Sequence, residues 1–237
     1  MLHLIFFLID FATATTPPQS FAHLKKIDIA GEAYIYVPSS IDCQPVEQEI
    51  EEEDGFDYDG PPVYDVCILE IANEKNVKIV YSSGPSDDPF FLFYPITKKR
   101  KTQEKPPILE LGASTLYIPN KNNIYAEGWS NTMFNLRRKY SFDGKGFQEI
   151  KQPFFYVGIQ TKVQEVGGEK DQKGLTLYTD KTKTNKVAML PIGSEIEVLL
   201  YEQPDWYLVR SSFGLVGWVF VPFGVHDTKI GVRFAGD

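Results

Sequence analysis

The feature that most constrains the fold is the regular spacing of short apolar runs from Ala33 onward. These runs are separated by clusters of Pro, Gly, Asn and Asp. Such spacing is typical of β-sandwiches and barrels. Between Phe134 and Phe142, apolar and polar residues alternate, which turns one side of a strand toward a core and the other toward water. The sequence therefore predicts an all-β chain, antiparallel for the most part.

The amino-terminal part contains eight expected strands. They are Ala33–Val37, Val63–Ala72, Val77–Ser82, Phe90–Tyr94, Ile108–Ile118, Met133–Phe142, Phe147–Lys151 and Phe154–Val163. Turn-forming stretches such as Asp143–Gly146 lie between them, because glycine adopts positive φ at little cost. Only the region around Ile108 would also accommodate a short helix.

A charged, glycine-containing stretch at 164–173 divides the chain of 237 residues. We interpret it as a linker between two domains. This division predicts a β-rich domain of unrecognised family at 27–163 and a small module at 174–224. Residues 1–22 are then a signal peptide and leader, and residues 225–237 are a tail or an extra strand.

The small module shows five evenly spaced strand patterns. They are Leu175–Tyr178, Lys186–Leu190, Glu195–Tyr201, Trp206–Arg210 and Leu215–Val221. Together with Pro191-Ile192-Gly193 before the third strand, and the Asp205–Arg210 and Gly214–Val219 pair, this order resembles a bacterial SH3-like (SH3b) domain. The resemblance covers about 50 residues. The first strand departs from the family's frequent Asn-x-Arg-x pattern, because it reads Leu175-Thr176-Leu177-Tyr178.

The resemblance implies a small SH3-like β-barrel that works outside the cytoplasm and binds a peptide or cell-wall material. The long loop Thr179–Asn185 then lies exposed beside aromatic side chains that can stack on a ligand. The candidate ligand-binding residues are Tyr178, Trp206 and Tyr207. Trp206 and Tyr207 point to opposite faces of a strand, so at least one reaches the surface. We expect Trp218 in the core.

The amino-terminal stretch Leu2–Phe11 is apolar but too short to span a bilayer, which takes roughly 20 residues. Ala12-Thr13-Ala14 then supplies the small residues of a signal-peptidase site. We therefore expect a secreted, periplasmic or cell-surface protein with no integral membrane span. Against a signal peptide stand Asp10 and the lack of basic residues before the apolar run.

The two cysteines, Cys43 and Cys67, are compatible with export. They would close a loop worth roughly 3.5 kcal/mol in the chain-entropy model. Two separate reduced thiols, with Cys67 acting as a small core residue, are an equally good interpretation.

Acidic residues are concentrated in one loop at 42–60. Its nine acidic residues account for the whole net charge of -8, so the rest of the chain is close to neutral. Phosphate binding needs a basic face. Nucleic acid is therefore not an expected partner.

Within this loop, Asp54, Asp57 and Asp59 are weak candidates for a calcium site. In the register of an EF-hand loop, Asp57 and Asp59 take the third and fifth positions. The first position falls on Gly55 and the twelfth on Val66, which supply no side-chain ligand. A solvated acidic loop is the favoured interpretation, and no metal is expected.

No catalytic constellation is evident. The chain has only three histidines, and the H-E-x-x-H motif of zinc proteases is absent. We therefore predict a non-catalytic binding protein without a cofactor, whose partner is a peptide, peptidoglycan or another envelope protein. The alternatives are a structural protein whose barrel packs on its neighbour and a calcium-dependent adhesion protein.

Overall fold

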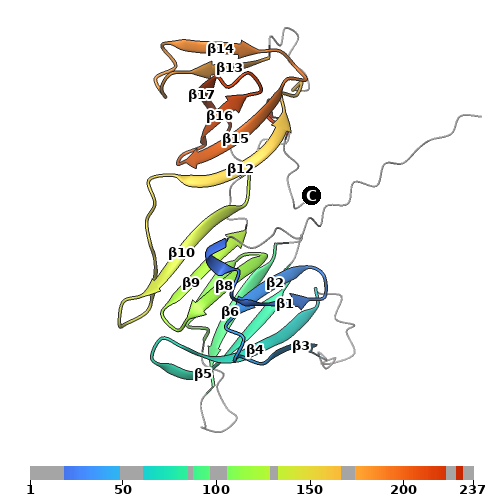
Figure 1. The fold of residues 1–237 in the computed structure, drawn as a ribbon, viewed down its shortest axis with the longest axis vertical. Helices are drawn as coiled ribbons and strands as arrows, with labels where there is room; N and C mark the ends of the chain where they lie inside the picture. Colours follow the sequence, from blue (N-terminus) through green and yellow to red (C-terminus); the bar gives the residue numbers. More distant parts are fainter. Residues whose placement is uncertain are drawn as a thin grey trace, which may run out of the picture.

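The fold is described from a computed structural model that covers residues 19–48, 61–84, 88–96, 106–128, 133–166, 174–222 and 228–231. These residues form β-strands in three sheets and one short 3-10 helix, η1 (Gln19–Phe21), with no α-helix among them. The expected all-β class is therefore confirmed. Two sheets make up a first unit and the third sheet forms a second unit above it (Figure 1).

The first sheet contains six strands in the order β1-β2-β8-β9-β10-β11. Their bounds are β1 Lys25–Ile29, β2 Ala33–Val37, β8 Thr115–Asn120, β9 Asn123–Gly128, β10 Leu136–Phe142 and β11 Phe147–Glu149. Its neighbouring strands are antiparallel except β2 and β8, which are parallel.

The second sheet contains five antiparallel strands in the order β3-β4-β5-β6-β7. Their bounds are β3 Cys43–Glu47, β4 Val63–Ile71, β5 Glu74–Ser82, β6 Phe90–Pro95 and β7 Leu109–Gly112. Side chains of both sheets share one core. Ile35 of β2, Ile79 of β5 and Phe93 of β6 are fully buried in it. The first unit is therefore a sandwich of two sheets.

Most strands of this unit coincide with the apolar runs that predicted them. The predicted strand Ala33–Val37 matches β2, but the predicted strand Ile108–Ile118 divides into β7 and β8, which belong to different sheets. β1, β3 and β9 were not expected, because each is short and carries charged or polar residues. Residues 49–60 of the acidic loop lie outside the described residues.

The third sheet forms the second unit, in the order β12-β15-β16-β17-β13-β14. Its strands are β12 Phe155–Lys162, β13 Leu175–Tyr178, β14 Lys186–Leu190, β15 Glu195–Glu202, β16 Trp206–Ser211 and β17 Val216–Phe220. The last five coincide closely with the five strand patterns of the small module. β12 pairs with β15, so this strand belongs to the second unit although it precedes the expected linker at 164–173. Ile230, from the expected tail, pairs with Val163 in an isolated bridge.

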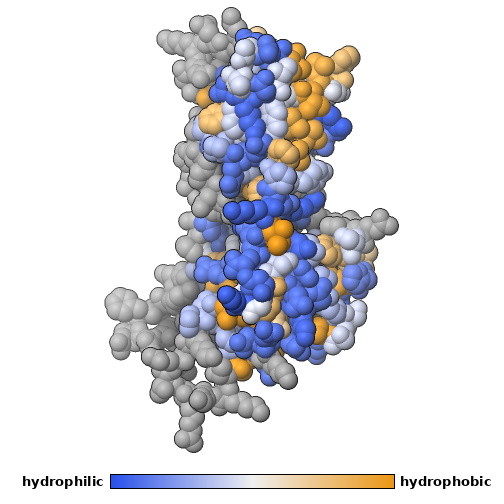
Figure 2. All heavy atoms as spheres, turned by 90° about the vertical axis from the view of Figure 1, so that its left-hand side faces the viewer, coloured by the Kyte–Doolittle hydropathy of each residue, from blue (hydrophilic) through white to orange (hydrophobic). Residues whose placement is uncertain are grey.

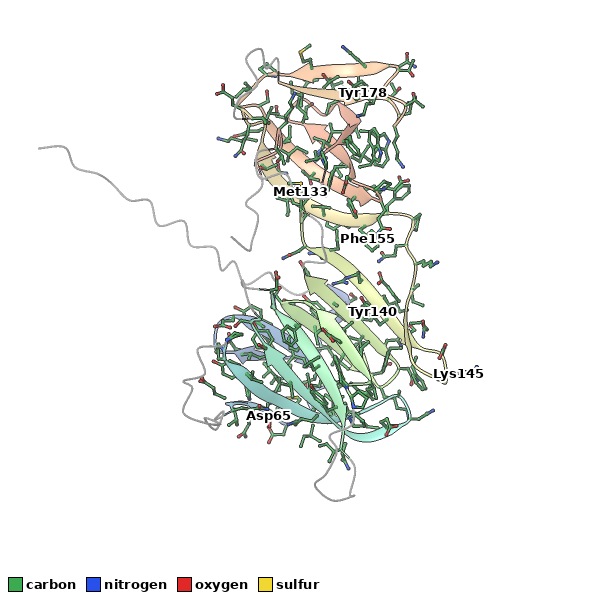
Figure 3. All side chains as sticks on the ribbon, turned by 180° about the vertical axis from the view of Figure 1, so that it is seen from behind. Asp65, Met133, Tyr140, Lys145, Phe155 and Tyr178 are labelled. Atoms are coloured by element: carbon green, nitrogen blue, oxygen red, sulfur yellow. A yellow bond between two sulfur atoms is a disulfide. The ribbon has the colours of Figure 1, made fainter. Side chains whose placement is uncertain are left out.

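The segment leading into β10 connects the two units. Met133, Phe134 and Leu136 are buried in the core of the second unit, whereas Tyr140, farther along the same strand, is buried in the core of the first. The Phe134 ring meets the ring of Tyr207 edge-on, with 5.3 Å between centroids. Met133 accordingly lies at the base of the upper unit in Figure 3, and Tyr140 lies in the lower one.

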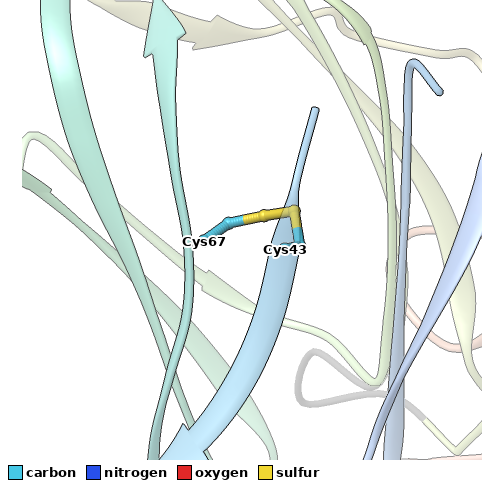
Figure 4. The surroundings of a disulfide bond; sticks show 2 residues. All are labelled: Cys43 and Cys67. Carbon is cyan, nitrogen blue, oxygen red and sulfur yellow. A yellow bond between two sulfur atoms is a disulfide. The ribbon is translucent and has the colours of Figure 1, made fainter. Parts of the chain in front are cut away.

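A disulfide joins Cys43 of β3 to Cys67 of β4 (Figure 4). The two residues are directly paired in the sheet, with Cα atoms 4.7 Å apart, and both are buried. Because β3 is an edge strand, the bridge attaches this edge to the sheet covalently.

Replacing both cysteines by serine is expected to lower the free energy of unfolding by about 3.5 kcal/mol, because the crosslink restricts the unfolded chain. Urea titration of the oxidised protein and of the double variant measures this difference. Equal stabilities would show that the bridge does not contribute.

Candidate binding surfaces

The second unit carries a row of apolar side chains across five strands. The strand registers place them side by side in the order Tyr156, Leu200, Leu208, Trp218 and Tyr178. Three further aromatic residues lie beside this row, each two positions along the chain from one of its members. We call the whole set the aromatic face: Phe154, Tyr156, Tyr178, Leu200, Trp206, Leu208, Trp218 and Phe220.

The aromatic face points away from the core because side chains alternate along each strand. Residues adjacent to it in sequence, such as Leu177, Tyr207 and Val219, fill the core beneath. Gly217 permits this packing, because a Cβ there would lie 2.7 Å from Cβ of Leu177. Where the aromatic face lies, both sides of this sheet are therefore apolar.

Several members of the face remain accessible. Tyr156 is 48% exposed, and Phe154 and Phe220 are each 41% exposed. Trp206 and Trp218 are partly exposed. Hydrophobic side chains gather on the second unit, whereas the corresponding side of the first unit is mainly hydrophilic (Figure 2). Exposed apolar surface that is concentrated in one region marks interaction sites more often than scattered residues do.

The loop Thr179–Asn185 lies along this face and has its own internal hydrogen bonds. The amide of Thr179 donates to the carbonyl oxygen of Asn185 at 3.0 Å. The Asp180 carboxylate accepts hydrogen bonds from the amide and hydroxyl of Thr182, which lowers the pKa of Asp180. These hydrogen bonds give the loop a defined turn conformation with the charged side chain of Asp180 at the turn.

Two lysines of this loop cover the aromatic face. Nζ of Lys181 lies 4.8 Å from the ring centroid of Trp218, and Nζ of Lys183 lies 5.4 Å from Trp206 and 4.7 Å from Phe220. These are cation–π distances. Lys181 also forms an ion pair with Glu202, whereas Lys183 has no ion pair among the described residues. The face thus combines aromatic rings with one uncompensated positive charge.

The structure separates the three residues predicted to bind a ligand. Tyr178 and Trp206 lie on the aromatic face, but Tyr207 is only 1% exposed and packs against Phe134 and Tyr201 in the core. Trp218 was expected in the core and instead lies on the aromatic face. The register explains this correction, because Trp218 pairs with Tyr178 and projects from β17 on the same side.

Tyr156 was missed because it lies before the expected linker. It belongs to the face because β12 pairs with β15. A bulge follows it, with Gly158 at φ +68°, and a Cβ on Gly158 would lie 2.4 Å from the Tyr156 hydroxyl. The sequence indicates this bulge at Gly158, because a glycine inside a strand pattern often marks a bulge.

A second row of aromatic residues crosses the outer side of the first sheet. In register it reads Lys26, Tyr36, Tyr117, Tyr125 and Lys139. The rings of Tyr36 and Tyr117 are stacked with centroids 4.6 Å apart. We call Tyr36, Tyr117 and Tyr125 the tyrosine row.

Phe21 of η1 covers the tyrosine row. Its centroid lies 4.8 Å from those of both Tyr117 and Tyr125. Phe21 falls inside the segment 1–22 that was predicted as signal peptide and leader. Because its ring packs against Tyr117 and Tyr125, Phe21 belongs to the folded first unit.

Beside Phe21 and the tyrosine row is a pocket of about 290 Å³. At its rim, Arg137 donates two hydrogen bonds to the Glu127 carboxylate, at 3.1 and 3.3 Å. The hydroxyl of Tyr117 is buried and has no hydrogen-bond partner among the described residues. Burial raises the pKa of this hydroxyl, and the nearby Glu127 charge adds to the effect. Tyr117 therefore remains a neutral hydrogen-bond donor.

The described residues contain no group of three or more His, Cys, Asp or Glu side chains that could hold a metal ion. The weak calcium candidates Asp54, Asp57 and Asp59 lie outside the described part of the chain. No helix within that part is long and apolar enough to cross a membrane.

Replacing Tyr117 by Phe is expected to leave the free energy of unfolding unchanged or to raise it by up to about 1 kcal/mol, because it removes a buried hydroxyl without a partner. Tyr140→Phe is the matched control. The Tyr140 hydroxyl donates to the Glu149 carboxylate at 3.3 Å, so its loss is expected to cost about 1 kcal/mol. Urea denaturation compares the variants, and a Tyr117→Phe protein destabilised as much as Tyr140→Phe would contradict this account.

Comparison with known proteins adds no relative: the chain matches no family model, no curated protein and no solved structure.

Proposed function

We propose that this protein is a non-catalytic binding protein whose SH3-like second unit recognises a peptide or peptidoglycan ligand outside the cytoplasm. The observation that carries the proposal is the cross-strand row Tyr156, Leu200, Leu208, Trp218 and Tyr178, left accessible on a sheet whose other side already supplies a core.

The shape and composition of the aromatic face support an extended ligand. The row crosses five strands, so a bound chain would contact several rings in succession. Aromatic side chains bury a large area at low conformational-entropy cost and are enriched among residues that dominate binding energy. Such a surface suits a peptide better than a compact small molecule.

Charge supports a ligand that carries carboxylates. Lys183 lies over Trp206 and Phe220 without an ion pair among the described residues. A ligand carboxylate beside Lys183 would form an ion pair with it at the edge of the apolar surface. The stem peptides of peptidoglycan carry free carboxylates, as do acidic peptides of envelope proteins.

The disulfide supports the proposed location. Bridges of this kind form and persist in oxidising compartments and are rare in the cytosol. Cys43 and Cys67 are buried and directly paired across two strands, which is the arrangement of a structural bridge. Together with the apolar stretch Leu2–Phe11 and the Ala12-Thr13-Ala14 site, it favours a secreted, periplasmic or cell-surface protein.

Sedimentation with purified peptidoglycan sacculi tests the proposal. The unmodified chain is expected to cosediment, and Trp218→Ala is expected to reduce the bound fraction at least tenfold, as for a residue at the centre of an interface. Trp218 projects outward and is only partly buried, so the variant is expected to fold.

Phe213→Ala is the matched control. Phe213 is 88% exposed at the β16–β17 turn and is not part of the aromatic face, so its loss is expected to leave binding unchanged. Equal loss in both variants would indicate general adhesion through exposed rings. Failure of the unmodified chain to bind sacculi, soluble stem peptides or envelope proteins would contradict the proposal and favour a barrel that only packs on its neighbour.

A further inference from the structure

The pocket beside the tyrosine row lies on the first unit and is separate from the aromatic face. Its walls are mainly apolar and include Phe21, Tyr117, Tyr125 and Ile150. Ile150 is 43% exposed although it is a large aliphatic residue. At about 290 Å³, the pocket is near the lower limit of small-molecule sites.

The rings around this pocket have a defined order. Tyr36, Tyr117 and Phe21 form a stack with interplanar angles of 16° and 21°. Tyr125 is equally close to Phe21, with 4.8 Å between centroids, but its ring is tilted by 58°. A flat ring of a ligand can pack against these walls by the stacked or edge contacts that aromatic pairs prefer.

The polar groups of the pocket favour an anionic ligand. Glu127 is the one carboxylate in its lining, and both of its oxygens accept hydrogen bonds from Arg137. Lys139 also lines the pocket and lies over the Tyr125 ring at 5.5 Å, with no ion pair among the described residues. The positive charge of Lys139 is therefore uncompensated there.

The Tyr117 ring forms part of the pocket wall, whereas its hydroxyl is enclosed and does not open into the pocket. Tyr117 therefore contributes apolar surface to the pocket. The charge of Lys139 is the polar feature that would select the ligand.

We infer that the pocket formed by Phe21, Tyr117, Tyr125 and Lys139 binds a small ligand that combines one aromatic ring with one carboxylate. The ring occupies the apolar walls, and the carboxylate lies beside Lys139. Either a free aromatic acid or the carboxyl-terminal aromatic residue of a peptide has this chemistry. The inference does not depend on the function proposed for the second unit.

Titration of the ¹⁵N-labelled chain, followed by ¹H–¹⁵N NMR, tests the inference with three probes. N-acetyl-phenylalanine carries both groups, N-acetyl-phenylalaninamide lacks the charge, and N-acetyl-alanine lacks the ring. We expect the first to bind at least about threefold more tightly than either of the others, the size of one exposed ion pair. Gly-Gly-Phe, compared with N-acetyl-phenylalanine, distinguishes a peptide terminus from a free acid.

Charge variants locate the site. Lys139→Gln is expected to remove the preference for the acid over the amide, and Lys139→Arg is expected to restore it. Lys145→Gln is the control, because Lys145 lies at the tip of the β10–β11 hairpin (Figure 3) and does not line the pocket. Trp218→Ala is expected to leave this binding unchanged, which separates it from the function of the aromatic face.

Three results would overturn the inference. One is the absence of binding by every probe, and another is equal affinity for the acid and the amide. The third is a preference for the acid that persists in Lys139→Gln.

Discussion

The aromatic face exists because of the cross-strand register of the third sheet. This register places Leu177, Tyr207 and Val219 in a core and leaves Trp218 and Tyr178 on the opposite side. A sheet with one solvated face ordinarily has polar residues there. In this protein the second face is aromatic as well, and the lysines of the loop Thr179–Asn185 lie over its rings. Under the proposed function, this face is the surface that contacts the ligand.

The aromatic face reaches the first unit at Tyr156, which contacts Arg137 of β10. Arg137 of β10 lies over the ring of Tyr156, 5.3 Å from its centroid, while its guanidinium holds Glu127 in the first sheet. The same arginine lines the pocket beside the tyrosine row. Residues at the edges of the two candidate surfaces therefore meet at this one side chain.

Strand positions with strong alternation were predictable from the sequence, because the period of two follows directly from strand geometry. β15 shows this, because Glu195 and Glu197 alternate with the buried Ile196 and Val198. The sheet to which each strand belongs was not predictable. β12 was assigned to the first domain because it precedes a charged stretch, yet it pairs with β15. Pairing between distant segments is decided by packing, which a local pattern does not contain.

The candidate site was predictable only in part for the same reason. Alternation shows that Trp206 and Tyr207 point to opposite sides, but it does not show which side is the core. The structure buries Tyr207 among the rings of Phe134 and Tyr201, and Phe134 enters that core from the first unit. Trp218 was expected inside because it lies between Val216 and Phe220. Those two residues are exposed and project on the same side as Trp218, whereas Gly217 and Val219 face the core.

The indole N–H signals of Trp206 and Trp218 provide the most direct measurement. Muramidase-solubilised peptidoglycan fragments would be titrated into ¹⁵N-labelled protein while these two signals are followed by NMR. The account predicts that both shift in a saturable, concentration-dependent manner, together with the amides of the loop Thr179–Asn185. Saturable shifts confined to other parts of the chain, or no shifts with any fragment, would contradict the claim that the aromatic face is the binding surface.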